Sequence, residues 1–233
     1  MSPNLKYSRC RALAIAVLLC LVGLSASAGT VTYTDQPSFL AALPGHAWTL
    51  DFDSTSSGTP ATLVPSGSGI GPIKFSYSIA GLTMEVVSDF DTTSLPNSLG
   101  LNDPGNYNQF IAGDPFDMTF DWPIRALGLY FITTADPVFP GDILLVTLVG
   151  TATNAGTPNL ILPDTGTAYF VGLVSDAEFT SAKVQFDPVA VGTFLYNVDD
   201  ITINTPEPAA VLLCAAGLAL LAVRRVLTVR PHR

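Results

Sequence analysis

Positive charge is confined almost entirely to the two ends of this chain, and each end also carries an uninterrupted apolar run. Seven of the ten Lys and Arg residues lie in the first 11 or the last 10 residues of the 233-residue sequence. Basic residues beside an apolar run are typical of segments that direct a chain to or through a membrane, and such segments are not part of a folded core. The central region alone must therefore supply the folded domain.

The first 28 residues have the composition of a secretory signal peptide. Three basic residues precede an apolar stretch from Ala12 to Leu24, and Ala26 and Ala28 then form the small-x-small pattern that signal peptidase cleaves. We predict cleavage after Ala28 and export through the inner membrane. Signal peptidase is therefore one expected partner.

The last 28 residues combine three features in a fixed order. They are Pro206-Glu207-Pro208, an uncharged apolar run from Ala209 to Val223, and the pair Arg224-Arg225 within a basic tail. As a helix, the apolar run would be about 22 Å long. It is shorter than the usual span of about 20 residues, but terminal arginines can reach the headgroups, so we predict a short transmembrane helix with a cytoplasmic C-terminus.

This order of features resembles the PEP-CTERM sorting signal. The resemblance implies that a membrane protease of the exosortase type cuts near Pro206-Glu207-Pro208 and passes the protein to the cell surface or extracellular matrix of a Gram-negative bacterium. It also implies a link to exopolysaccharide and biofilm. The eight residues that follow Arg225 make a longer tail than is usual in that family. A plain single-span membrane anchor is the alternative.

The region between the targeting segments, residues 29–205, is strongly acidic and free of cysteine. It holds 18 acidic and three basic residues, so its net charge is −15, whereas the whole chain has −9. Such a domain repels nucleic acid and anionic membrane surfaces and attracts divalent cations. All three cysteines lie in the targeting segments, so the exported domain has neither a disulfide nor a thiol nucleophile.

Short β-rich runs separated by Gly, Pro and Ser predict an all-β domain, an antiparallel β-sandwich of jelly-roll type. One short N-terminal helix is expected over residues 35–43, capped by Asp35 and with Pro37 in its first turn. A turn at residues 79–82 is expected to close a hairpin. The expected strands cover residues 30–34, 47–52, 73–79, 82–87, 109–112, 116–120, 126–132, 143–149, 160–162, 168–174, 182–186 and 194–203.

Two short stretches of the domain also resemble jelly-roll domains that are common in PEP-CTERM proteins. One is the opening order of a strand, a short Phe-containing helix and Leu50-Asp51-Phe52-Asp53, and the other is the closing run from Asn197 to Ile203. Alternation along the strands assigns a set of side chains to the core. These are Leu129, Phe131, Val171, Leu173, Ile201 and Ile203, and a core position is also favoured for Trp48 and Trp122 over a role as sugar-stacking platforms.

Four aspartates form the candidate metal site. Asp51 and Asp53 flank a Phe, and alternation along a strand would place both carboxylates on one face. If the first and last core strands are neighbours, this pair approaches Asp199 and Asp200, and Ca²⁺ prefers such oxygen ligands. The alternative is that these aspartates are solvated strand ends, with each Phe inward and each Asp outward.

The sequence favours a binding protein over an enzyme. His46 is the only histidine of residues 29–205, which excludes a multi-histidine zinc site, and no Gly-x-Ser-x-Gly nucleophile elbow occurs. We therefore expect a non-enzymatic surface or matrix protein that binds carbohydrate, with Ca²⁺ as a candidate cofactor. A secreted polysaccharide hydrolase with paired aspartates and a purely structural matrix component are the alternatives.

Overall fold

The computed structural model describes residues 29–43, 45–64, 73–89, 92–133, 145–148, 151–154, 160–162, 166–186 and 194–205. The predicted signal peptide with its cleavage site and the predicted sorting segment lie outside these residues, so both stay predictions. Among the residues described, no helix has the length and apolar character needed to span a membrane.

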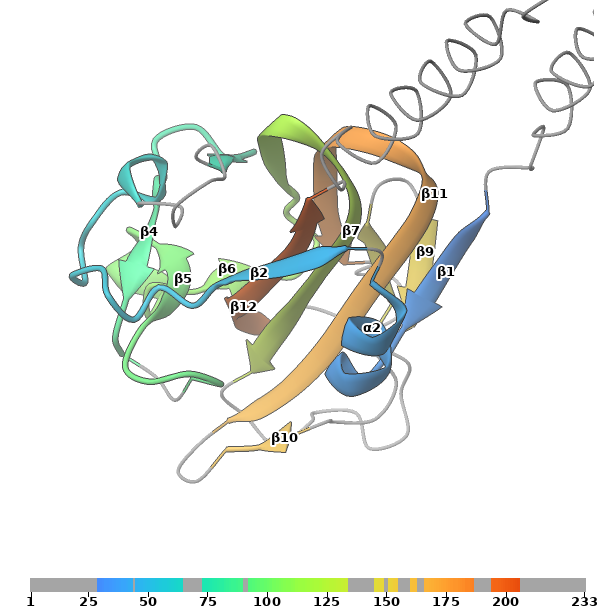
Figure 1. Ribbon diagram of the computed structural model, residues 1–233. Helices are drawn as coiled ribbons and strands as arrows, with labels where there is room; N and C mark the ends of the chain where they lie inside the picture. The colour runs from blue at the N-terminus through green and yellow to red at the C-terminus, as the bar shows by residue number, and fades with distance from the viewer. Residues whose placement is uncertain are drawn as a thin grey trace, which may run out of the picture.

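The described chain forms an antiparallel β-fold with one α-helix (Figure 1). The helix α2 covers Gln36–Ala42, and the short 3-10 turns η1 and η2 cover Ala61–Leu63 and Pro104–Asn106. The strands are β1 (Thr30–Tyr33), β2 (His46–Leu50), β3 (Lys74–Tyr77), β4 (Met84–Val87), β5 (Ser98–Leu101), β6 (Phe110–Ile111), β7 (Phe116–Thr133), β8 (Leu145–Leu148), β9 (Thr151–Asn154), β10 (Leu160–Ile161), β11 (Thr167–Phe186) and β12 (Leu195–Thr205).

Two long strands, β7 and β11, form the centre of the fold, and the other strands pair along them or beside them. The main path of neighbours runs β4-β5-β12-β7-β11-β8-β9. The short strands β1 and β10 pair with β11, β3 pairs with β7, and β2 and β6 pair with β12. β7 and β11 run diagonally across the molecule beside each other (Figure 1).

Each central strand replaces two predicted short strands, which is a correction to the sequence prediction. Residues 116–120 and 126–132 belong to one strand that continues through Pro123, and residues 168–174 and 182–186 belong to another. The register between them shifts around Phe179, opposite the Trp122-Pro123 step. Proline is tolerated within a sheet at such irregularities, because a ladder hydrogen bond is already missing there.

The central pair buries both of its faces along residues 126–132 of β7 and 167–173 of β11. The larger hydrophobic cluster includes the six side chains that strand alternation assigned to the core, and these six predictions are confirmed. The members in question are Leu129, Phe131, Val171, Leu173, Ile201 and Ile203, each at most 1% exposed. The smaller cluster lies on the other face and contains Phe39, Ala126, Tyr130, Ile132, Leu162, Ala168 and Phe170.

Helix α2 covers this second face by placing Phe39 on a pair of glycines. Asp35 caps the helix as predicted, because its Oδ1 accepts a hydrogen bond from Ser38 N at 2.8 Å. Gly128 and Gly172 lie opposite each other in the β7–β11 ladder. A Cβ added at Gly172 would lie 2.6 Å from Phe39 Cδ2, and one at Gly128 would lie 2.8 Å from Phe39 Cε1. The two glycines therefore make the space into which the helix docks.

Two further differences from the sequence prediction concern the partners of two strands and the number of strands. The turn at residues 79–82 is present, with Leu82 N donating to Ile79 O, but its flanking strands do not form the predicted hairpin, because β3 pairs with β7 and β4 with β5. Sequence analysis also missed β5 and β9. All four residues of β5 are buried, so no alternation marks it, and a Cβ at Gly100 would lie 2.3 Å from Asn108 O.

The described chain starts and ends in one region, which we call the chain-end rim and define as Gly29, Arg125, Asp176, Glu178 and Asn204. Gly29 N donates to Asp176 Oδ2 at 3.1 Å, just before β1. Two residues along β11, Glu178 Oε1 accepts from Arg125 Nη2 at 3.3 Å, and Arg125 N donates to Asn204 Oδ1 at 2.9 Å. β11 and Arg125 therefore connect the start of β1 to the end of β12.

Candidate functional site

The four predicted metal-ligand aspartates come together at the junction of β2 and β12. These strands are antiparallel neighbours, and their ladder ends at the pair Leu50 and Ile201. The next residues outward are Asp51, just after β2, and Asp200 of β12. β2 is the strand that leads into the first Asp pair, so Asp51 and Asp53 lie near enough to Asp200 to raise its pKa, and the Ca²⁺ site at this position stays a prediction. We call Asp51, Asp53, Asp199 and Asp200 the carboxylate cluster.

The backbone at Asp51 and Asp53 is a turn, and not the extended strand that the sequence predicted. β2 ends at Leu50, and Phe52 has a φ of 62°, in the left-handed region. Asp53 N donates to Asp51 Oδ1 at 3.2 Å, which closes the turn. The Phe side chain is 1% exposed, whereas Asp51 is exposed and Asp53 is half-buried. The prediction that Phe points inward is therefore confirmed, but strand alternation is not the cause.

Asp199 and Asp200 lie at a bulge in β12. The register between β12 and β7 shifts between Asp199 and Thr202, and Asp200 has a φ of 50°. Asp200 N donates to Asp199 Oδ1 at 2.8 Å. The bulge leaves the Asp199 side chain with no exposed surface. The alternative that all these aspartates are solvated strand ends is therefore wrong for Asp199.

A loop that the sequence analysis did not select binds the Asp199 carboxylate. Asp199 Oδ2 accepts hydrogen bonds from Thr93 N at 3.0 Å, Thr93 Oγ1 at 2.8 Å, Ser94 N at 3.0 Å and Ser94 Oγ at 3.3 Å. The same loop reaches the other side of the cluster, because Asn97 N donates to Asp53 Oδ1 at 3.3 Å. Residues 92–97 therefore hold the two halves of the cluster together through neutral donors.

One sequence signal for this loop is a repeat, because the run Asp89-Phe90-Asp91-Thr92-Thr93 has the same pattern as Asp51-Phe52-Asp53-Ser54-Thr55. In the structure the hydroxyl residue Thr93 makes the contact, while Asp89 Oδ2 accepts instead from Asn108 Nδ2 at 2.8 Å.

The cluster has an excess of negative charge. Burial, and to a smaller extent the neighbouring Asp200 carboxylate, raise the pKa of Asp199 to about 8 against the opposing effect of the hydrogen bonds from Ser94, Thr93 and Asp200. Burial also raises the pKa of Asp200, with a contribution from Asp51 and Asp53, and it raises the pKa of Asp53. Proton uptake or a bound cation would relieve the repulsion.

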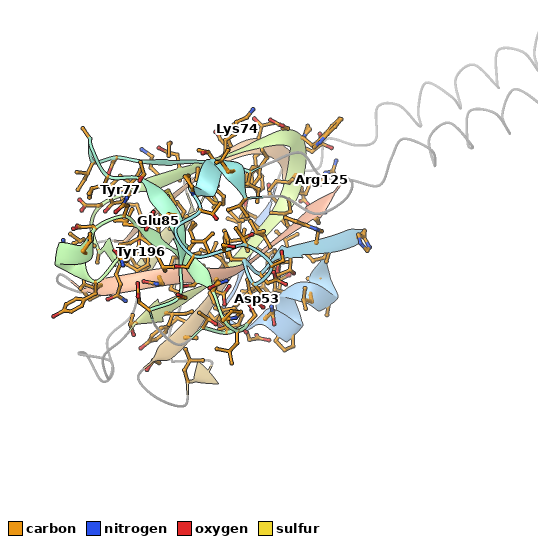
Figure 2. All side chains as sticks on the ribbon, turned by 90° about the vertical axis from the view of Figure 1, so that its left-hand side faces the viewer. Asp53, Lys74, Tyr77, Glu85, Arg125 and Tyr196 are labelled. Atoms are coloured by element: carbon orange, nitrogen blue, oxygen red, sulfur yellow. The ribbon has the colours of Figure 1, made fainter. Side chains whose placement is uncertain are left out.

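The described cations do not supply that charge. Lys74 pairs with Asp121 at 2.7 Å and Arg125 pairs with Glu178 at 3.3 Å. Figure 2 shows Lys74 and Arg125 along one edge of the domain, well away from Asp53. As the described side chains stand, no three carboxylate, imidazole or thiol groups are arranged to hold a metal ion. A cation at the cluster would therefore need Asp51 and Asp53 to turn toward Asp200, with carbonyl oxygens as further ligands.

Two aromatic side chains stand out on the surface. Trp122 is 58% exposed on β7, so the favoured core position for this residue is wrong, because it lies at the irregular Pro123 step and not on a regular inward face. Tyr107 is 67% exposed and ends the turn η2. Trp48 is partly buried against the larger cluster, close to its predicted role. His46 is exposed.

Comparison with known proteins adds only distant likenesses. No known family model matches the chain, and the comparison with curated proteins found no match. An arabinose-bound α-L-arabinofuranosidase is 18% identical with a TM-score of 0.39, over 66% of this chain and 25% of that one.

Two carbohydrate-binding modules give weaker likenesses still. A mutant module of family 29 is 9% identical with a TM-score of 0.28, over 70% of this chain and 94% of that one. A xylan-binding domain from Paenibacillus barcinonensis is 11% identical with a TM-score of 0.24, over 67% and 95%. The chain spans about a quarter of the length of the arabinofuranosidase it matches, and all three likenesses are too distant to assign a family or a function.

Proposed function

We propose that this chain is an exported, non-enzymatic protein of the cell surface or extracellular matrix. Signal peptidase removes residues 1–28, a C-terminal transmembrane helix at residues 209–223 anchors the chain, and an exosortase-type protease then acts near Pro206-Glu207-Pro208. The observation that carries the proposal is the position of the folded domain between these segments. β1 begins at Thr30 and β12 ends at Thr205, so both processing positions fall at the very edges of the fold.

The arrangement of the chain ends supports this proposal. A chain that is held at a membrane through both of its ends before processing needs those ends on the same side of its domain. The chain-end rim meets this requirement, because β11 and Arg125 link Gly29 to Asn204 through the contacts described above. Both processing enzymes would then find their sites on the side of the domain that faces the membrane.

Within this proposal the domain is a jelly-roll-type β-sandwich that binds exopolysaccharide. Two exposed aromatic rings, Trp122 and Tyr107, offer stacking surfaces, and amide and carboxylate groups flank Tyr107. Asn106 Nδ2 is held by Asp103 Oδ2 at 2.7 Å, and Asn108 Nδ2 is held by Asp89 Oδ2. Exposed aromatics beside fixed polar groups suit sugars, whose faces are apolar and whose edges carry hydroxyls.

The hydrolase alternative is weakened by burial. Asp199 has the raised pKa that a catalytic acid needs, but its side chain has no exposed surface and cannot reach a glycosidic bond. An enzymatic role would fall to Asp51, Asp53 and Asp200. A purely structural matrix protein would show no sugar binding at all.

The sorting step is tested in a bacterium that carries an exosortase-type protease. We expect the full chain to lose its C-terminal segment and leave the membrane, whereas Pro206→Ala combined with Glu207→Ala is retained with residues 209–233 attached. Asp121→Ala, an acidic-residue control outside the chain-end rim, should be processed normally. Release of the double variant at the control rate would count against exosortase sorting.

Sugar binding is tested on a panel of exopolysaccharides, with and without Ca²⁺. Tyr107→Ala or Trp122→Ala should weaken binding by about 2- to 13-fold if the ring stacks on a sugar, because one aromatic contact is worth about 0.5–1.5 kcal/mol. Tyr107→Phe keeps the ring and serves as the matched control. Absence of binding to every polysaccharide on the panel would favour a purely structural matrix component. Loss of polysaccharide over time would favour the hydrolase.

A further inference from the structure

The first described residue is held by a reciprocal pair of hydrogen bonds. Gly29 N donates to Asp176 Oδ2 at 3.1 Å, and Asp176 N donates to Gly29 O at 3.0 Å. The ladder between β1 and β11 begins at the next position, where Thr30 pairs with Ser175. Asp176 therefore closes the outer end of a four-residue edge strand whose side chains are mostly exposed.

We infer that Asp176 is a binding site for the new N-terminus that signal cleavage creates. This inference rests on the proposed export. Hydrolysis of the Ala28–Gly29 peptide bond consumes one water, leaves a carboxylate on Ala28 and leaves Gly29 with a free amine. Below its pKa this amine carries a proton, and the nitrogen 3.1 Å from Asp176 Oδ2 changes from a neutral amide to an ammonium. The ammonium adds the attraction between two opposite charges to the hydrogen bond that the amide N–H already donates to the carboxylate.

The surroundings favour this pairing. Asp176 and Glu178 are the acidic side chains of β11 beside the start of β1, and Glu178 is already paired with Arg125 of β7. Near the helix, Asp35 is used as the cap of α2, and β9 contains no titratable residue. The two side-chain ion pairs of the described residues do not include Asp176. Among these residues, the Gly29 ammonium would therefore be the one cation paired with Asp176.

Glycine at position 29 suits the role. A Cβ at this residue would lie 3.3 Å from Asp176 Oδ2, a closer approach than most real Cβ atoms make. A larger first residue would push the carboxylate away from the nitrogen. In the precursor the Gly29 nitrogen is an amide without a positive charge, so its hydrogen bond to Asp176 lacks the ion-pair attraction, and the edge strand becomes more firmly attached after export.

The test uses the full chain, secreted in a Gram-negative host that lacks an exosortase-type protease and extracted from its membrane in detergent. Intact mass gives the N-terminal residue, and pH-dependent labelling with an amine-selective reagent gives the pKa of its amine. In the wild type we expect this pKa to lie above its usual value of about 8. Asp176→Asn should lower it by roughly 0.2–0.7 pH units, the range expected for an exposed ion pair. The matched control Glu178→Gln should leave it unchanged.

The pair should also appear in stability. Because the amine has a higher pKa in the folded state, its contribution is complete below about pH 8 and is lost as the pH rises through the folded-state pKa. Asp176→Asn should therefore lower Tm by roughly 1–3 °C at pH 6.5 and by nothing measurable above pH 10.

Each failure is distinguishable. A retained leader would overturn both the export proposal and this inference. A mature chain that starts at another residue would overturn the inference and leave export standing. If the mature chain starts at Gly29 but its amine has the same pKa in the wild type and in Asp176→Asn, Asp176 does not bind the amine. The same conclusion follows if Glu178→Gln changes this pKa as much as Asp176→Asn does.

Discussion

Carboxylates are stabilised in two opposite ways in the described part of this domain. Asp121 and Glu178 lie at the surface, 35% and 43% exposed, and each faces a cation. Asp199 is fully buried and is held by neutral N–H and O–H donors from Thr93, Ser94 and Asp200. Surface ion pairs are typically worth about 0–1 kcal/mol, whereas leaving buried donors without an acceptor costs about 1–3 kcal/mol each. We therefore expect the neutral donors around Asp199 to contribute more to the free energy of unfolding than the surface ion pairs do.

The largest expected effect comes from Asp199→Ala, which leaves Thr93 N, Ser94 N and Asp200 N without their shared acceptor. We expect the free energy of unfolding to fall by at least about 3 kcal/mol. For a domain of this size that lowers Tm by roughly 6–12 °C, as measured by a thermal melt at pH 6. Asp121→Ala is the matched surface control, with an expected loss of about 0–1 kcal/mol. If the two variants lost the same free energy of unfolding, the buried site would contribute no more to stability than a surface ion pair.

The next effect is the response to Ca²⁺, which would sharpen the contrast if the cluster needs a cation and the surface pairs do not. Free Ca²⁺ at about 100 times its Kd would add about 2.7 kcal/mol, or roughly 5–11 °C in Tm relative to EDTA. Asp51→Asn combined with Asp53→Asn should abolish this response. The surface pair of substitutions Asp117→Asn and Asp121→Asn should preserve it. An identical Tm in EDTA and Ca²⁺ would mean that the cluster is neutralised by protons alone.

The third prediction concerns pH in the absence of divalent cations. Asp199 has an ordinary pKa of 3.8 and a folded-state pKa of about 8, so the folded state binds more protons between these values. The stability that this carboxyl contributes is complete below about pH 4 and is lost as the pH rises toward 8. Tm should therefore fall between pH 5 and 8 and level off above pH 9.

Asp200→Asn separates the causes of that slope. It removes the neighbouring carboxylate that helps to raise the pKa of Asp199, and Asn tolerates the left-handed φ of this position. We expect a shallower decline and a gain on the order of 1 kcal/mol at pH 8. A decline of unchanged slope would show that burial alone sets the pKa of Asp199.

The sequence made the meeting of the aspartates predictable but not the burial of one of them. The two Asp pairs and the expected neighbouring strands could be found from short motifs. The burial of Asp199 depends on a bulge in β12 and on donors from Thr93, which is 106 positions away in the chain. No local pattern encodes a contact of that range. Trp122 was misplaced for the same reason, because the irregular step at Pro123 depends on the register with β11.

The smallest expected effect is that of Lys74→Met, which breaks the shorter of the two surface ion pairs. The Lys74 side chain is 62% exposed, so solvent and salt already screen its attraction to Asp121. We expect a loss of at most about 0.5 kcal/mol, or roughly 1–2 °C in Tm, at low ionic strength. Repeating the melt in about 1 M salt, where the Debye length is about 3 Å, should erase most of this difference. The loss caused by Asp199→Ala should persist in the same salt, because the donors that it leaves buried are uncharged. If salt reduced both losses alike, the buried site would depend on charge in the same way as the surface pair, and short ion pairs would be a fair guide to what holds this domain together.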